Sequence, residues 1–228
     1  MEFTSAAFWA ALGSIVLANI LLSGDNAVVI ALAARALPPH QQKRAIVLGS
    51  AAAIVMRVVL TIVAVQLLTL PWLKIIGSVL LLWIGVNLMG EEEDEVHHDH
   101  KPLGIGAAIR IILVADLVMS LDNVLAVAAA AHGNNVLLVL GLAISIPLIV
   151  FGSTLLLKVM ERFPLIITAG AALLGWLAGE MFSSDPALLK LTGPLPHAVG
   201  VTAGIVGAVL VVAVGTWMDR RRRQRRQA

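Results

Sequence analysis

Two aspartate–asparagine pairs lie inside long apolar runs of the chain. The stretch SGDNAVVIALAAR contains Asp25 and Asn26, and the stretch MSLDNVLAVAAAA contains Asp122 and Asn123. An aspartate at the centre of a membrane span costs about 2.5–3.5 kcal/mol, so such residues usually face a bundle interior or an aqueous cavity. Carboxylate and amide oxygens are the ligands that Mg²⁺, Mn²⁺ and Ca²⁺ prefer. The doubled pair therefore predicts a site for a hard divalent cation.

Further polar residues accompany each pair at helical spacing. The residues that share one helix face are Asn19, Ser23 and Asn26 in the first run and Asp116, Ser120 and Asn123 in the second. Each aspartate of a pair lies about 100° round the helix from its asparagine. Either the polar stripe is broad, or the helix opens near Gly24 and re-aims Asp25. We count Asp116 as a further candidate metal ligand and expect Asn19, Ser23 and Ser120 to line the site.

An arginine stands in the middle of another apolar run. Arg57, in AAAIVMRVVLTIV, is the candidate counter-charge for the carboxylates when no cation is bound. Protonation of one carboxylate is the other way to relieve their repulsion. Both routes predict that cation entry is coupled to departure of a proton or of the arginine partner.

The composition places these residues in a membrane. Of the 228 residues, 59% are hydrophobic and only 13% are charged, and the mean hydropathy is +0.95. Because about 20 apolar residues cross a bilayer as a helix, we predict an all-α polytopic protein. Its seven predicted spans are residues 8–31, 45–68, 73–90, 104–131, 135–158, 164–182 and 198–217.

The basic residues predict the orientation. Connections that alternate along the chain carry most of the lysine and arginine, ending with six arginines between Arg220 and Arg226. Cytoplasmic loops are enriched in these residues. We therefore expect the N-terminus outside and the C-terminus in the cytoplasm.

The two halves of the chain resemble each other. The pattern A-[ND]-x3-S-x-D-N occurs at Ala18 and again at Ala115, and GSVLLLW at Gly77 resembles GAALLGW at Gly170. Because each half has an odd number of spans, three, the two halves cross the membrane in opposite orientations. This is the inverted-repeat architecture of many secondary transporters. We predict one transmembrane domain over residues 1–217. It divides into a first repeat at about 5–90, a second at about 104–182, and a seventh span at about 198–217.

Two charged segments flank these repeats on the cytoplasmic side. The loop 91–103 contains EEEDEVHHDH, so His97, His98 and His100 are weak metal-binding candidates. The tail 218–228 is basic, and we expect it to anchor on anionic lipid. It lacks aromatic residues that could stack bases, which argues against nucleic acid as a partner.

Several function classes are excluded by what the sequence lacks. There is no cysteine, so thiolate metal sites and disulfides are absent. No GxxxxGK[ST] stretch is present, so an ion gradient or downhill flow would drive transport. No nucleophile pairs with the histidines near the predicted outer loops, so we do not expect an enzyme or a permanently bound cofactor.

The doubled motif and the arginine of the second span resemble the TerC family. The short seven-span form is similar to its YjbE-type members, within the wider LysE-like exporter superfamily. The resemblance covers about residues 5–217 and implies a multi-pass protein of the bacterial inner membrane that handles divalent metal, most plausibly by manganese efflux. It places metal ligands at the two Asp-Asn pairs, with Arg57 and Asp116 following. The second motif departs from the first where Leu121 replaces Gly24.

We therefore expect an exporter of a divalent cation, with Mn²⁺ as the first hypothesis, that works by alternating access with proton exchange. One alternative is a LysE-like exporter of a small organic cation or amino acid. Another is a non-transporting membrane partner for metallation of secreted enzymes or for tellurite resistance. The sequence leaves the metal, the coupling ion and homo-oligomer formation open.

Overall fold

The computed structural model describes residues 8–9, 12–17, 24–67, 70–89, 104–130 and 135–227. Within these ranges, only the backbone is described for residues 62–67, 121–130, 135, 137–138, 222–223 and 225–227. The described residues form helices and no strands, so the predicted all-helical class is confirmed for this part of the chain. The labelled helices are α2 (Gly24–Arg35), α3 (Pro39–Leu67), α4 (Leu73–Met89), α5 (Ile105–Ala130), α6 (Asn135–Arg162), α7 (Leu165–Ser183), α8 (Pro186–Thr192) and α9 (His197–Gln227).

Helix length and composition make this an integral membrane protein. Four described segments are long and apolar enough to cross a bilayer: Pro39–Thr61, Val139–Arg162, Leu165–Ser183 and His197–Arg221. Helix α4 is a shorter apolar helix. The count of seven spans stays a prediction, because residues 18–23, in the first predicted span, lie outside the description.

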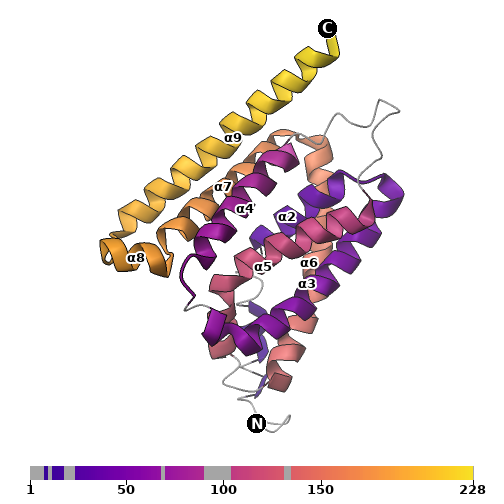
Figure 1. Ribbon diagram of the computed structural model, residues 1–228. Coiled ribbons are helices and arrows are strands. Elements are labelled where there is room, and N and C mark those ends of the chain that lie inside the picture. The colour runs from indigo at the N-terminus through magenta and orange to yellow at the C-terminus, as the bar shows by residue number, and fades with distance from the viewer. Residues whose placement is uncertain are drawn as a thin grey trace.

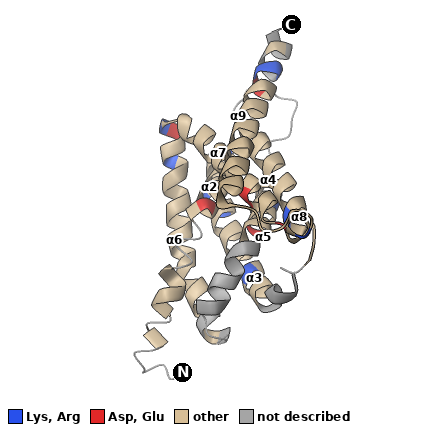
Figure 2. Cartoon of the chain, turned by 90° about the vertical axis from the view of Figure 1, so that its left-hand side faces the viewer, with Lys and Arg blue, Asp and Glu red and all other residues tan. Residues whose placement is uncertain are grey.

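The outer surface of the bundle is apolar. Large side chains that a soluble protein would bury are more than half exposed, including Val55 on α3, Trp83 on α4, Phe151 on α6 and Val209 on α9. Figure 2 shows that Lys, Arg, Asp and Glu are sparse along the helices and that basic residues gather near the C-terminal end of α9. Such a surface suits contact with lipid chains. Lipid is as apolar as these side chains, so exposing them to it carries no free-energy cost.

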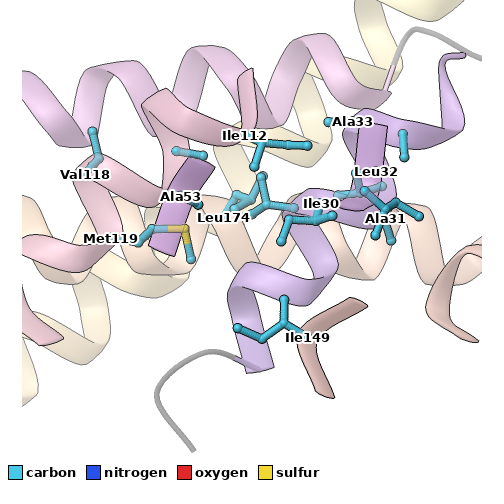
Figure 3. Packing of buried hydrophobic residues seen from close by; sticks show 14 of the residues in the cluster. Ile30, Ala31, Leu32, Ala33, Ala53, Ile112, Val118, Met119, Ile149 and Leu174 are labelled. Carbon is cyan, nitrogen blue, oxygen red and sulfur yellow. The ribbon is translucent and has the colours of Figure 1, made fainter. Parts of the chain in front are cut away.

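The helices lie in two neighbouring groups. In Figure 1, α9 lies along α7, and α4 lies beside α7, while α2, α3, α5 and α6 make up the other side of the bundle. One buried apolar cluster runs through both groups, and Figure 3 shows part of it, with Ile30 of α2, Ile112 of α5 and Leu174 of α7. The polar residues of the candidate site therefore lie in a tightly packed interior.

Glycines let α7 and α9 approach closely. A Cβ added to Gly175 would collide with the backbone of Gly207, and a Cβ added to Gly179 would collide with the backbone of Ala203. Small residues four apart allow this kind of backbone contact between membrane helices. Helix α9 is therefore part of the bundle, and it continues as a helix past the predicted end of the span at 217.

The short helix α8 was not predicted, although its sequence carries the usual boundary signals. Asp185 is its N-cap and accepts a hydrogen bond of 2.7 Å from the Ala187 N–H, and Pro186 occupies the first turn. Gly193 ends the helix with φ of 77°. Seven residues are too few for the apolar periodicity that guided the prediction of spans.

Asp185 also caps α4, which is more than 100 residues away in sequence. Its carboxylate accepts from the N–H groups of Trp72, Lys74 and Ile75 at 3.1–3.2 Å. Trp72 has φ of 70°, a left-handed conformation that side chains rarely adopt. Burial of Asp185 raises its pKa, but the four backbone donors outweigh burial and hold the pKa below its usual value. One buried carboxylate thus joins the start of α4 to the α7–α8 corner.

We predict that Asp185→Ala lowers the free energy of unfolding in detergent by about 2 kcal/mol, because two helix caps are lost at about 1 kcal/mol each. The folded-state pKa is depressed, so this stabilisation is complete above the ordinary value of 3.8 and is lost as the pH falls below it. The difference in thermal midpoint between wild type and variant should be constant from neutral pH to about pH 5 and shrink in stronger acid. Ser184→Ala is the control, since the Ser184 hydroxyl lies at the same corner and accepts from Lys74 Nζ at 3.3 Å but has no described bond to a backbone N–H of α4 or α8. Equal midpoints for wild type and Asp185→Ala at neutral pH would contradict the capping role.

Candidate functional site

The first Asp-Asn pair lies in the described part of α2. This part runs from Gly24 to Arg35, with Asp25 and Asn26 as its second and third residues. The Asn26 backbone N–H donates to Asp25 Oδ1 at 2.8 Å. This hydrogen bond holds the Asp25 carboxylate beside the Asn26 backbone, within the length of the first predicted span.

A buried ion pair links α3 to α5 close to this pair. Arg57 of α3 donates from Nη2 to Asp116 Oδ1 and from Nε to Ser120 Oγ at 3.1 Å. Ser120 Oγ in turn donates to Asp116 Oδ2 at 3.3 Å. Arg57 is 2% exposed and Asp116 5% exposed. Both carboxylate oxygens of Asp116 are therefore engaged, and in this arrangement Asp116 is the anion that balances Arg57.

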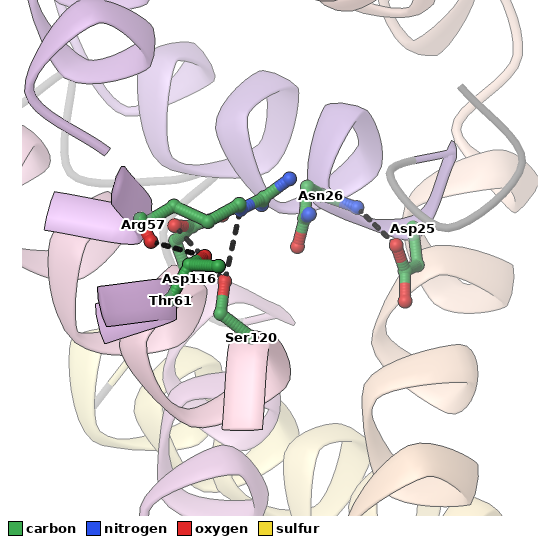
Figure 4. A network of polar contacts seen from close by, with 6 residues as sticks. All are labelled: Asp25, Asn26, Arg57, Thr61, Asp116 and Ser120. Atoms are coloured by element: carbon green, nitrogen blue, oxygen red, sulfur yellow. Dashed lines mark hydrogen bonds and ion pairs between the residues drawn. The ribbon is translucent and has the colours of Figure 1, made fainter. Parts of the chain in front are cut away.

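The side chain of Asn26 is buried without a hydrogen-bond partner. It is 3% exposed, and neither Oδ1 nor Nδ2 makes a hydrogen bond in the described structure. Figure 4 draws Asn26 between the Arg57–Asp116 pair and Asp25, and the charges of Arg57 and Asp116 both act on Asp25. Buried polar atoms are nearly always satisfied, so an unpaired buried amide is unusual and points to a functional role for it. The chain therefore keeps an amide oxygen free next to a carboxylate.

The second motif continues within an unbroken helix. The backbone of α5 is helical from Ile105 to Ala130, through Leu121, Asp122 and Asn123. Asp122 lies about 9 Å along the axis from Asp116, and Asn123 falls on nearly the same face as Asp116. The side chains of Asp122 and Asn123 are outside the description.

The remaining predicted site residues lie outside the described residues. These are Asn19 and Ser23 of the first motif and His97, His98 and His100 of the acidic loop. Among the residues that the structure does describe, no group of three or more His, Asp or Glu side chains could hold a metal ion. The described half of the candidate site therefore offers one carboxylate, Asp25, and one free amide, Asn26. A full set of ligands requires the second motif.

Two buried serines were not singled out from the sequence. Ser50 of α3 is 1% exposed and Ser153 of α6 is 0% exposed, and neither hydroxyl has a partner. Most other described helical hydroxyls bond to a carbonyl one turn earlier, as Thr61 does to Arg57 at 2.7 Å. That is the usual behaviour of serine and threonine within a helix. Sequence alone has no signal that separates the two kinds of serine.

The polar groups of this site that the structure describes are a carboxylate, an unpaired amide and an arginine paired with Asp116, all within an apolar helix bundle. Residues 4–224 match the family described as "Integral membrane protein TerC family". The chain belongs to the TerC family.

Relatives of this TerC protein occur in distantly related bacteria. It is 47% identical to the "Uncharacterized membrane protein YjbE" of Bacillus subtilis over 170 residues, covering 75% of this chain and 78% of the relative. It is 27% identical to "Uncharacterized membrane protein YceF" of the same species over 233 residues, covering 98% of this chain and 88% of the relative. "UPF0053 inner membrane protein YgdQ" of Escherichia coli K12 is 30% identical over 176 residues, covering 68% of this chain and 73% of the relative. No solved structure matches the chain.

The ion pair generates a prediction about stability. Removing one partner of a buried pair leaves an uncompensated charge and typically costs about 3–5 kcal/mol, whereas removing both can be nearly neutral. We expect Arg57→Gln and Asp116→Asn each to lower the thermal midpoint in detergent clearly, and the double variant to be more stable than either single variant. Thr61→Val is a control that removes a hydroxyl bonded to the Arg57 carbonyl oxygen and leaves the side chains of the pair unchanged. Additive losses in the double variant would show that the two side chains act independently.

Proposed function

We propose that this protein exports a divalent cation, with Mn²⁺ as the first candidate, through a site shared by the two Asp-Asn motifs. Asp25 and Asp122 supply the charged ligands, and Asn26 and Asn123 supply neutral amide oxygens. Asp116 holds Arg57 when the cation is absent. The proposal involves no chemical reaction, and the metal is cargo and not a resident cofactor.

The observation that carries this proposal is the free Asn26 amide. Its oxygen is buried and unpaired one residue from the Asp25 carboxylate. An amide left unsatisfied in a protein interior costs free energy, so its retention is explained if another group uses it in a different state. Mn²⁺, Mg²⁺ and Ca²⁺ all accept a carboxylate together with neutral oxygens.

The helix neighbours support a repeat that brings the two motifs together. If α2, α3 and α4 correspond to α5, α6 and α7, a twofold relation requires that α3 contacts α5 whenever α6 contacts α2. Both pairs are in contact, and α2 also contacts α5, α3 contacts α6 and α4 contacts α7. These are the neighbours expected of inverted repeats, which in transporters meet at a central site. A shared site explains why the pair occurs twice.

Charge balance supports a cation as the cargo. In the described residues, Arg57 forms an ion pair with Asp116, and its charge acts on Asp25 without a described ion pair between the two. A second carboxylate at Asp122 would raise the demand for a positive ion. We propose proton exchange as the coupling, because a proton relieves the same repulsion when the metal leaves.

The relatives and the C-terminal end of α9 support a proposal for the membrane and the orientation of this protein. Similarity to a membrane protein of Bacillus subtilis and to an inner-membrane protein of Escherichia coli fits the bacterial inner membrane. We propose a cytoplasmic C-terminus whose arginines contact anionic lipid. Trp217 and Arg221 support an interfacial position for this end of α9, since the Arg221 guanidinium lies 4.0 Å from the Trp217 ring centre.

The test is Mn²⁺ flux in proteoliposomes with an internal pH dye. Wild type should carry Mn²⁺, and Asp25→Asn and Asp122→Asn should each reduce flux by about a hundredfold, because each loses a charged ligand while its size is kept. Glu180→Gln, a partly exposed acid on α7, is the control that should keep its flux. A simultaneous pH change identifies the proton as counter-ion.

Three outcomes would contradict the proposal. Flux in both aspartate variants equal to wild type would show that the ion passes elsewhere. Inhibition of flux by amino acids would favour the exporter of a small organic cation. Absence of flux from wild type would favour a non-transporting partner of metallation or tellurite resistance.

A further inference from the structure

The helices separate into two groups that are more tightly joined within themselves than to each other. In the first group, α7 packs most extensively on α9 and on α4, and α4 also packs on α9. In the second, α3 packs most extensively on α5, and α6 packs on α2 and α3. We call α4, α7, α8 and α9 the frame unit and α2, α3, α5 and α6 the site unit. Figure 1 shows them as neighbouring sides of the bundle.

The frame unit is locked by backbone contacts and by Asp185. Gly175 and Gly179 of α7 lie directly against the backbone of α9, and a Cβ on Gly85 of α4 would lie 3.1 Å from Val211 of α9 and 3.4 Å from the Ala171 carbonyl of α7. The Asp185 carboxylate bonds the start of α4 to the α7–α8 corner. These contacts leave no room for the three long helices to slide on one another.

The site unit is joined by the ion pair and by its own glycine contacts. Arg57 binds Asp116 and Ser120 across α3 and α5. A Cβ on Gly49 of α3 would lie 2.6 Å from Ile112 of α5. Every described residue of the candidate cation site belongs to this unit.

The contacts between the units are less extensive than those within them. Gly77 of α4 faces Val118 of α5, and Gly170 of α7 faces Val28 and Leu32 of α2. In these contacts, apolar side chains pack directly against a glycine. A hydrogen bond that crosses between the units runs from Arg35 Nη2 to the Leu88 carbonyl oxygen at 3.0 Å, at the cytoplasmic end in the predicted topology. Limited apolar contact between two groups of helices suits shear or rocking, whereas interlocked backbones do not.

We infer that the frame unit and the site unit move against each other as two rigid bodies, and that this motion opens the site to alternate sides of the membrane. The inference rests on the proposed transport function. Each body takes helices from both sequence halves, since α4 and α7 are the third helices of the two repeats. The division therefore cuts across the repeats and does not separate them. The hydrogen bond between Arg35 and the Leu88 carbonyl must break when the cytoplasmic ends of α2 and α4 move apart.

Disulfide locking tests this division, because the chain has no cysteine. The pair Gly77→Cys with Val118→Cys crosses the boundary. Two control pairs stay within a unit: Ala27→Cys with Gly152→Cys in the site unit and Gly85→Cys with Val211→Cys in the frame unit. The Cβ positions of residues 27 and 152 are 3.9 Å apart, which suits a disulfide. Oxidation should reduce Mn²⁺ flux of the crossing pair by about tenfold or more, reversibly with reductant, because it blocks a required motion. Both control pairs should retain flux when oxidised.

A distance measurement keeps the inference separate from the transport proposal, because it needs no flux. Nitroxide labels at lipid-facing positions would report distances in the reconstituted protein by pulsed electron resonance. The pair Trp83→Cys with Phe151→Cys crosses the boundary, whereas Trp83→Cys with Val209→Cys and Val55→Cys with Phe151→Cys lie within one unit. We expect two distance populations for the crossing pair and one for each internal pair. A single population for the crossing pair, or two for an internal pair, would overturn the division even if Mn²⁺ is transported.

Discussion

The rest of this structure depends on the need to neutralise a guanidinium inside an apolar helix bundle. Arg57 is nearly inaccessible, and water that would otherwise solvate its charge is excluded. Asp116 and Ser120 satisfy it from the next helix, which fixes α3 against α5 at one register. In the proposed function, Asp116 balances Arg57 and the aspartates of the repeated pairs attract the cation. Charge neutrality and cation affinity would then belong to different carboxylates.

The same constraint explains the free amide. A second carboxylate in the place of Asn26 would add a charge that nothing described nearby balances, whereas an amide adds an oxygen ligand without charge. Leaving that amide unpaired in the interior is unfavourable when the site is empty. A bound cation would satisfy it, so affinity for the cargo would offset a cost that the empty protein carries.

The sequence was sufficient for the helical class, the membrane location and the family. Long apolar runs specify helices because the bilayer leaves the backbone no other partner, so α3 to α7 fall close to the predicted spans. Finer features escaped prediction because they depend on tertiary contacts. Arg57 pairs with Asp116, and not with Asp25, because of the register between α3 and α5. A helical wheel describes one helix at a time and cannot predict that register. Asp185 looked like an ordinary loop residue, since its bonds to α4 come from a segment more than 100 residues earlier.

The structure answers the question of a helix break for the second motif. The backbone of α5 is continuous through Leu121, Asp122 and Asn123, and leucine favours continuation of a helix. For the first motif, residues 18–23 lie outside the described residues, so a break near Gly24 that re-aims Asp25 stays a prediction.

The most direct test of the shared site is a double-mutant cycle on Mn²⁺ binding. Free Mn²⁺ would be counted by its electron paramagnetic resonance signal in titrations of the purified protein, with Asp25→Asn, Asp122→Asn and the double variant. A single ion held by both motifs predicts one ion per chain in the wild type. It also predicts a double variant whose loss of affinity differs clearly from the sum of the single losses, because coupled residues are not additive. Two ions per chain, or losses that simply add, would contradict a common site.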